Sequence, residues 1–135
     1  KECLPLLTAL CDAGYDVSLE TSGALDIAGI DPRVARIMDL KAPDSGECAR
    51  NRWENLALLG PRDEIKIVIA SRGDYEWARE QLRERRLAEC CPVLLSPAQG
   101  LVDPTALAEW ILADGLAVRF QMQLHKLLWG NAKGK

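Results

Sequence analysis

Small and polar side chains recur where the predicted β-strands of this chain end. In chain order they are Glu20-Thr21-Ser22-Gly23, Asp39-Leu40-Lys41, Ala70-Ser71-Arg72, Ser96-Pro97-Ala98-Gln99 and Gln123-Leu124-His125-Lys126. Parallel α/β sheets bind their ligands at the carboxyl ends of the strands. These five segments therefore predict one shared site at one edge of a sheet, with solvated loops as the alternative.

Three of these segments suit the binding of a small polar ligand. Glu20 can accept hydrogen bonds from ribose hydroxyls or an amine, and Gly23 would let the backbone approach a ligand closely. Asp39 and Lys41 share a face of their strand because they are two residues apart. They form either a surface ion pair or a place where Lys41 meets a carboxylate. His125, the only histidine, fits either a structural role or a site.

The five cysteines form no metal-binding pattern. They are Cys3, Cys11, Cys48, Cys90 and Cys91, with no CxxC pair and no Cys/His cluster. We expect free thiols in a reducing cytoplasm, with the adjacent Cys90 and Cys91 acting as small hydrophobic side chains. The sequence also has no Ser/His/Asp arrangement and no glycine-rich phosphate loop.

The elements that position the polar segments alternate along the chain. Helices are predicted over residues 2–13, 51–59, 74–88 and 104–115, and strands over 15–19, 34–40, 65–70, 93–95 and 118–124. This order predicts right-handed βαβ units and a mostly parallel sheet with flanking helices. The chain is then a single α/β domain over residues 1–135, built as an open sheet or as part of a barrel.

Composition narrows the class of protein. The chain has 135 residues, 48% of them apolar and 27% charged, as in an ordinary globular domain. A formal net charge of -3 gives no basic surface, so we expect neither nucleic acid nor an anionic membrane as a partner. The apolar stretches fall far below the roughly 18 residues of a transmembrane helix, and no signal peptide opens the chain. The cytoplasmic location is expected from the free thiols.

Four segments, taken together and in order, resemble the 7-carboxy-7-deazaguanine synthase family. They are Glu20-Thr21-Ser22-Gly23-Ala24-Leu25-Asp26, Asp39-Leu40-Lys41-Ala42-Pro43-Asp44-Ser45-Gly46-Glu47, Asn51-Arg52-Trp53-Glu54-Asn55 and Gln123-Leu124-His125-Lys126-Leu127-Leu128-Trp129-Gly130. The resemblance covers essentially the whole chain. It implies a partial (β/α) barrel of the radical S-adenosylmethionine class.

The resemblance also implies a reaction. A lyase of this family contracts 6-carboxy-5,6,7,8-tetrahydropterin to 7-carboxy-7-deazaguanine with loss of ammonia, in queuosine and 7-deazapurine biosynthesis. Its cofactors would be S-adenosyl-L-methionine, a [4Fe-4S] cluster and Mg²⁺, and its partners an external electron donor and a second copy of the chain in a homodimer. The protein must position two ligands and keep water from a radical.

Roles for individual residues follow from the same resemblance. Thr21 and His125 would bind the substrate, and Gly23 would approach S-adenosylmethionine. The same cofactor would contact Asp39, Leu40 and Lys41 at one turn and Ser96, Pro97, Ala98 and Gln99 at another. Lys126 is a candidate partner for the pterin carboxylate. No catalytic residue and no metal ligand is assigned within this chain.

The family's CxxxCxxC cluster segment, its magnesium ligand and a Gly-Gly-Glu-Pro stretch have no counterpart in this sequence. We therefore expect the chain to be the C-terminal portion of such an enzyme, inactive by itself and with one open sheet edge. Two alternatives stay open. One is a related radical S-adenosylmethionine activase, and the other is a non-catalytic domain that binds an adenosyl ligand or another protein.

Overall fold

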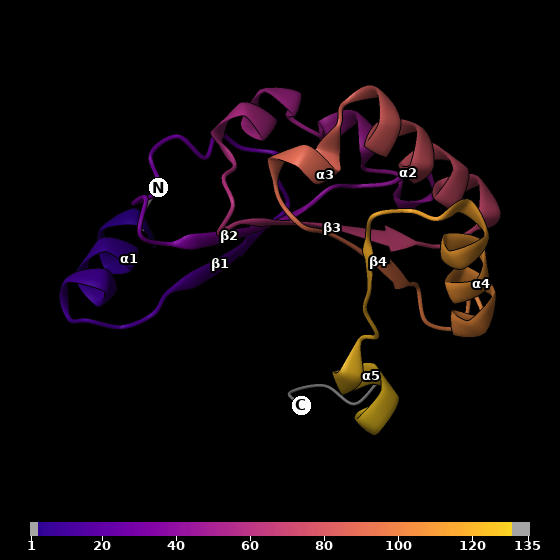
Figure 1. The fold of residues 1–135 in the computed structure, drawn as a ribbon. Coiled ribbons are helices and arrows are strands. Elements are labelled where there is room, and N and C mark those ends of the chain that lie inside the picture. The colour runs from indigo at the N-terminus through magenta and orange to yellow at the C-terminus, as the bar shows by residue number, and fades with distance from the viewer. Residues whose placement is uncertain (1–2, 131–135) are drawn as a thin grey trace.

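A parallel sheet forms the centre of the structure. The computed structural model describes residues 3–130, and its five strands are β1 (Ser18–Thr21), β2 (Ala35–Asp39), β3 (Glu64–Ile69), β4 (Val93–Pro97) and β5 (Arg119–Phe120). The strands lie side by side in chain order, and every neighbouring pair is parallel (Figure 1). The predicted α/β class and parallel sheet are confirmed. This lateral order is that of a barrel segment and differs from the order in doubly wound sheets.

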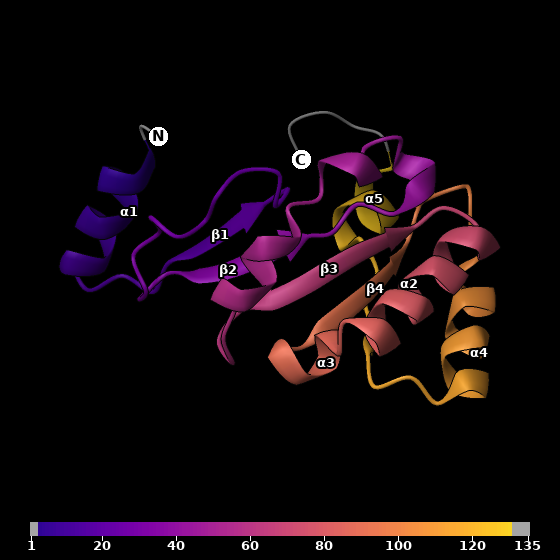
Figure 2. The same cartoon turned by 90° about the horizontal axis from the view of Figure 1, so that it is seen from above.

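Helices precede, connect and follow the strands. They are α1 (Cys3–Asp12), α2 (Arg72–Glu84), α3 (Leu87–Cys90), α4 (Pro104–Asp114) and α5 (Leu124–Trp129), with the short 3-10 helices η1 (Pro43–Ser45), η2 (Cys48–Arg50) and η3 (Trp53–Leu58). In both views α2 and α3 lie on one face of the sheet, and α5 lies on the opposite face (Figures 1 and 2). None of the described helices combines the length and apolarity that crossing a membrane requires.

Local signals place the two longest helices. Ser71 caps α2, because its side chain accepts a hydrogen bond of 3.1 Å from the backbone N–H of Asp74. Asp103 caps α4 in the same way, and Pro104 follows at the first helical position. Gly115 ends α4 in the left-handed conformation, as its position after the helix predicts.

The main core lies between the sheet and α2, α3 and α4. The side chains of β3 alternate, so that Ile65, Ile67 and Ile69 are fully buried on this face and pack with Tyr75 of α2 and Leu87 of α3. A second cluster joins Leu7 of α1 to four residues around the first strands, which are Val17, Ile27, Ile30 and Val34. Packing within the two clusters holds the strands in place.

The structure corrects several predicted boundaries. The predicted strand 118–124 pairs only through Arg119 and Phe120, and residues 124–129 form α5 instead. The alternation over 118–124 resembled a strand, whereas Leu124, Leu127 and Leu128 have the spacing of one helical face. The first strand runs over 18–21 rather than 15–19. The predicted helix 51–59 is the 3-10 helix η3, and the predicted helix 74–88 divides into α2 and α3 at Arg86, where φ is +52°.

Candidate functional site

The carboxyl ends of the strands bring four of the predicted segments to one edge of the sheet. Register pairs Thr21 with Met38, Asp39 with Lys66, and Ile69 with Pro97, so β1, β2, β3 and β4 all end at this edge. Two of the predicted segments begin inside a strand rather than after it. Glu20 and Thr21 lie in β1, and Ser96 and Pro97 lie in β4. The edge therefore exists, and the ligand roles assigned to its residues stay predictions.

At the end of β1 the backbone turns tightly over the sheet. Gly23 has φ +68°, and its N–H donates to the Thr21 Oγ1 over 3.2 Å. A Cβ at Gly23 would lie 2.8 Å from the Cγ of Met38 and 3.0 Å from its Sδ. Both the positive φ and this contact require glycine. The turn thus holds the backbone against Met38 of β2, and the approach of Gly23 to a ligand stays a prediction.

At the end of β2 an ion pair lies beside an unused acceptor. The Nζ of Lys41 is 2.6 Å from the Oδ2 of Asp39, and both side chains are about one-third exposed (31% and 28%). Within residues 3–130, the Oδ1 of Asp39 is buried without a hydrogen-bond partner. The side chain of Leu40 is in the core at 3% exposure, so only its backbone is left to contact a ligand. A small cavity of about 90 Å³ borders Lys41, Ser22 and Arg50.

At the end of β4 a second cavity is present. It has a volume of about 200 Å³ and is bordered by Pro97 and Gln99 of the β4 end and by Gln123 and Lys126 near α5. The Gln99 side chain donates to the Lys126 carbonyl over 3.3 Å, which joins α5 to the β4 end. In the described part of the chain, the buried Ser96 Oγ and Gln123 Oε1 have no hydrogen-bond partner. Ala98 is fixed by its N–H, which donates to the Ile69 carbonyl over 2.8 Å.

His125 lies in α5, beside Lys126. The placement of its side chain falls outside what the structure describes. Its predicted contact with a substrate therefore stays a prediction that rests on the resemblance.

The face of the sheet on the side of α5 carries charged residues. Because Ile65, Ile67 and Ile69 face α2, the alternate residues Glu64 and Lys66 belong to the opposite face. Register places Asp39 beside Lys66 on that face, and alternation places Glu20 there rather than Thr21. Both faces of a parallel sheet are ordinarily covered by apolar contacts. This face is instead partly exposed and includes Glu20, whose ligand role stays a prediction.

Three buried polar residues brace the edge, and the assigned roles omit them too. Asp74 at the start of α2 is 1% exposed, and its carboxylate accepts from the N–H groups of Asp44 and Ala70, each over 3.0 Å. Asn51 and Asn55, which are 9% and 0% exposed, contact the loops after β2 and β1. Both asparagines lie in the Asn51-Arg52-Trp53-Glu54-Asn55 segment that carries part of the resemblance. This segment is the only sequence feature that could have indicated their importance.

Charged groups elsewhere have structural explanations. At the start of the strands Arg36 and Asp63 form a nearly buried pair, with 2.6 Å between Nη2 and Oδ2. Burial alone would raise the pKa of Asp63. Hydrogen bonds from the Arg36 side chain and from the N–H groups of Arg36 and Gly60 outweigh burial and lower that pKa.

The cysteines are free thiols, as expected. Cys91 is buried in the core, and burial is the main cause that raises its pKa to about 12. Cys90 is half-buried, so of this adjacent pair Cys91 is the one that fully matches the expected small core side chain. No group of three or more His, Cys, Asp or Glu that could hold a metal ion occurs within the described residues.

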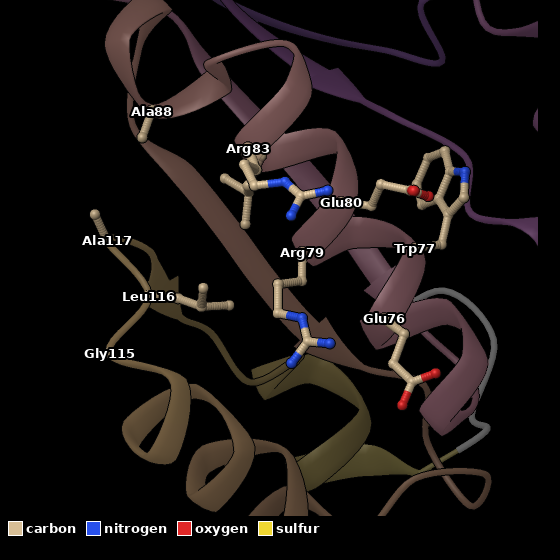
Figure 3. Close-up of a pocket in the computed structure, with 10 residues that line it drawn as sticks. Glu76, Trp77, Arg79, Glu80, Arg83, Ala88, Gly115, Leu116 and Ala117 are labelled. Carbon is tan, nitrogen blue, oxygen red and sulfur yellow. The ribbon is translucent and has the colours of Figure 1, made fainter.

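A larger cavity lies away from this edge. It is an open groove of about 790 Å³ between α2 and residues 115–117, with Trp77 and Leu116 among the side chains that border it (Figure 3). Arg79 and Glu80 of α2 also border it. None of the residues assigned a ligand role contributes to this groove.

Comparisons with known proteins agree with the resemblance. A 7-carboxy-7-deazaguanine synthase from Chlorobaculum tepidum is 46% identical over 133 residues, which cover 96% of this chain and 60% of that protein. One from Koribacter versatilis is 42% identical, covering 96% of this chain and 63% of that protein. No family model matches the chain.

A solved structure agrees in fold. The crystal structure of QueE from Escherichia coli superposes with a TM-score of 0.67 at 23% identity, over 90% of this chain and 50% of that one. At this identity the likeness shows the shared fold alone. The chain spans about 60% of the length of the two curated relatives. Over nearly all of its own length, this chain is therefore similar in sequence to the 7-carboxy-7-deazaguanine synthases.

Proposed function

We propose that this chain supplies the ligand-binding edge for the contraction of 6-carboxy-5,6,7,8-tetrahydropterin to 7-carboxy-7-deazaguanine with loss of ammonia. The observation that carries the proposal is the polar edge itself, in a chain 42% and 46% identical to relatives named for this product. A lyase of the radical S-adenosylmethionine class is the corresponding enzyme.

The residues at the edge fit S-adenosylmethionine. Its methionyl group carries an ammonium and a carboxylate, and its ribose carries two hydroxyls. Lys41 can pair with the carboxylate, while the unpartnered Asp39 Oδ1 can accept from an ammonium or a hydroxyl. Ser22 and Ala24, on either side of Gly23, border the small cavity at Lys41, and the cavity beside Pro97 and Gln99 offers apolar contact. When bound, this cofactor supplies the radical that abstracts a substrate hydrogen.

Substrate binding is assigned to the neighbouring groups. Thr21 accepts from Gly23, which leaves its own hydroxyl proton for an acceptor on the pterin. We assign His125 to the same ligand on the basis of the resemblance. Lys126, which borders the 200 Å³ cavity, is the candidate for the pterin carboxylate. A site that binds both ligands in the reacting orientation has already met the entropic cost of bringing them together, so the reaction barrier is lower.

The described residues do not fit an iron–sulfur cluster. No group of three His, Cys, Asp or Glu gathers in residues 3–130, so we assign this chain no ligand and no step at the cluster. Mg²⁺ and an external electron donor likewise rest on the resemblance alone, and we propose a cytoplasmic location from the expected free thiols.

We further propose that the protein forms a homodimer. The support is the resemblance together with α5, on which Leu124, Leu127 and Leu128 are 63%, 64% and 65% exposed. Analytical ultracentrifugation tests this proposal. A monomer at micromolar concentration would contradict it.

The function is tested with the protein in its full length, reconstituted anaerobically with iron, sulfide and a reductant. We expect 5′-deoxyadenosine and 7-carboxy-7-deazaguanine to form from the pterin and S-adenosylmethionine. Thr21→Val and His125→Ala should weaken pterin binding far more than cofactor binding. Equal losses would favour the activase alternative, and adenosyl-ligand binding without either product would favour a non-catalytic domain.

A further inference from the structure

Asn51 and Asn55 reach two different strand ends from one short segment. They flank the start of η3 and are four residues apart. Both are among the few buried polar residues of the described chain, at 9% and 0% exposure. A buried side-chain amide without a hydrogen-bond partner costs free energy. The hydrogen bonds of these two side chains therefore identify the segments that they position.

Asn55 holds the loop that follows β1. Its Nδ2 donates to the carbonyls of Gly23 and Leu25 over 3.0 and 2.8 Å, and its Oδ1 accepts from the Ile27 N–H over 3.4 Å. The backbone adds to this, since the Arg52 N–H donates to the Gly23 carbonyl over 3.3 Å. Both amide protons and the amide oxygen of Asn55 are thereby used on a single five-residue stretch.

Asn51 holds the end of β2 in the manner of a neighbouring strand. Its Oδ1 accepts from the Lys41 N–H over 2.9 Å, and its Nδ2 donates to the Lys41 carbonyl over 2.8 Å. The side-chain amide thus pairs with both backbone polar groups of one residue. The Lys41 side chain also forms the ion pair with Asp39. The two backbone hydrogen bonds therefore fix the position from which this side chain extends.

The two loops need such a connection. The register between β1 and β2 ends at Thr21 and Met38, so strand pairing no longer aligns the residues beyond. Segment 51–55 is short and tightly turned, with the Asn55 N–H donating to the Arg52 carbonyl over 3.1 Å. It therefore transmits the position of one loop to the other.

We infer that Asn51 and Asn55 are positioning residues that set the Gly23 turn against Lys41, and thereby the geometry of the ligand site between them. This inference rests on the proposed function for its ligand. The asparagines touch no ligand themselves, and they act through the loops that they hold.

The test is a double-mutant cycle on the full-length protein, with S-adenosyl-L-methionine as the probe in calorimetry. Asn51→Ala should lower its affinity about tenfold when Lys41 is present and less than about twofold in a Lys41→Ala background. The fall in melting temperature should be the same in both backgrounds. Equal affinity losses in the two backgrounds would overturn the inference, since a general loss of stability does not depend on Lys41.

Gln81→Ala is the matched control. Gln81 of α2 is a buried amide, 7% exposed. Its Oε1 accepts a hydrogen bond of 2.7 Å from the Nε of Arg85. We expect it to lower the melting temperature and to leave S-adenosylmethionine affinity unchanged. An affinity loss equal to that of Asn51→Ala would overturn the inference. If the alanine variants do not fold, Asn51→Asp takes their place, because it keeps the acceptor for the Lys41 N–H and loses the donor to its carbonyl.

Hydrogen exchange separates this inference from the proposed function. Asn51→Ala should speed exchange of the Lys41 amide, and Asn55→Ala that of the Ile27 amide, each by about tenfold relative to Met38. If the native protein binds no S-adenosylmethionine, the proposed function fails and the exchange result alone decides whether the asparagines fix the loops. Unchanged exchange at both amides would overturn the inference.

Discussion

The Lys41 ammonium lies 2.6 Å from one oxygen of the Asp39 carboxylate, while the other oxygen is buried without a hydrogen-bond partner among residues 3–130. A partly exposed pair of this kind contributes little to stability. Under the proposed function, a charged ligand would complete the unused acceptor and pair with the ammonium.

Replacing Lys41 with Met should therefore lower S-adenosylmethionine affinity about tenfold and change the melting temperature little. Calorimetry and thermal denaturation measure the two effects. Arg86→Met is the control, because Arg86 pairs with Glu89 at 73% and 63% exposure at the start of α3. Unchanged affinity in Lys41→Met would remove this residue from the site.

Gly23→Ala should destabilise the protein by about 2–4 kcal/mol, because positive φ strain and a clash with Met38 add together. Gly46→Ala is matched in φ, at +71° against +68°, but its Cβ meets nothing within 4 Å. This variant should lose only about 1 kcal/mol. Urea denaturation of both variants gives the difference, which reports the clash. Equal losses would mean that Met38 does not press on this turn.

Asp63→Asn should reduce stability at neutral pH by about 3 kcal/mol, because it removes the charge from a nearly buried pair with Arg36. The folded-state pKa of Asp63 is lowered, so its contribution is fully present above the unfolded pKa and is lost as the pH falls through the folded value.

In urea denaturation between pH 7 and pH 2, the native protein should lose stability faster below about pH 4 than Asp63→Asn does. Asp16→Asn serves as the control, since Asp16 is 97% exposed and faces Arg62 only at 3.9 Å. Parallel curves for the native protein and Asp63→Asn would contradict the assigned cause.

Thiol labelling should distinguish Cys3 from Cys91. Cys3 is exposed, whereas Cys91 is buried with its pKa raised to about 12, so little thiolate forms at pH 8. Under native conditions an aromatic disulfide reagent should modify Cys3 within minutes and Cys91 only with unfolding. Mass spectrometry of peptides locates the label. Rapid labelling at Cys91 would indicate that the core around β4 opens readily.

The sequence predicts the sheet well because its strands are defined locally. Ile65 to Ala70 alternates toward a core, and the βα order leaves a parallel arrangement as the natural solution. The side-by-side position of Asp39 and Lys41 also follows from a two-residue period, and the structure confirms it.

Other features depend on contacts that no local pattern contains. Asn55 finds its partners about thirty residues earlier in the chain, at Gly23 and Leu25. From local sequence alone, a polar residue beside a loop is expected to be exposed to solvent, because only the complete fold determines whether it is buried. The same reason explains β5, whose alternating residues continue past Phe120 although only two of them find a neighbour.

The strands stand in the sheet in the order in which they are synthesised. Ser18 pairs with Ala35, Ile37 with Glu64, and Leu94 with Arg119, so each strand meets the one made just before it. Loop closure then costs less entropy at each step than the pairing of strands that are distant in the chain would cost. The sheet can grow one strand at a time as the polypeptide leaves the ribosome.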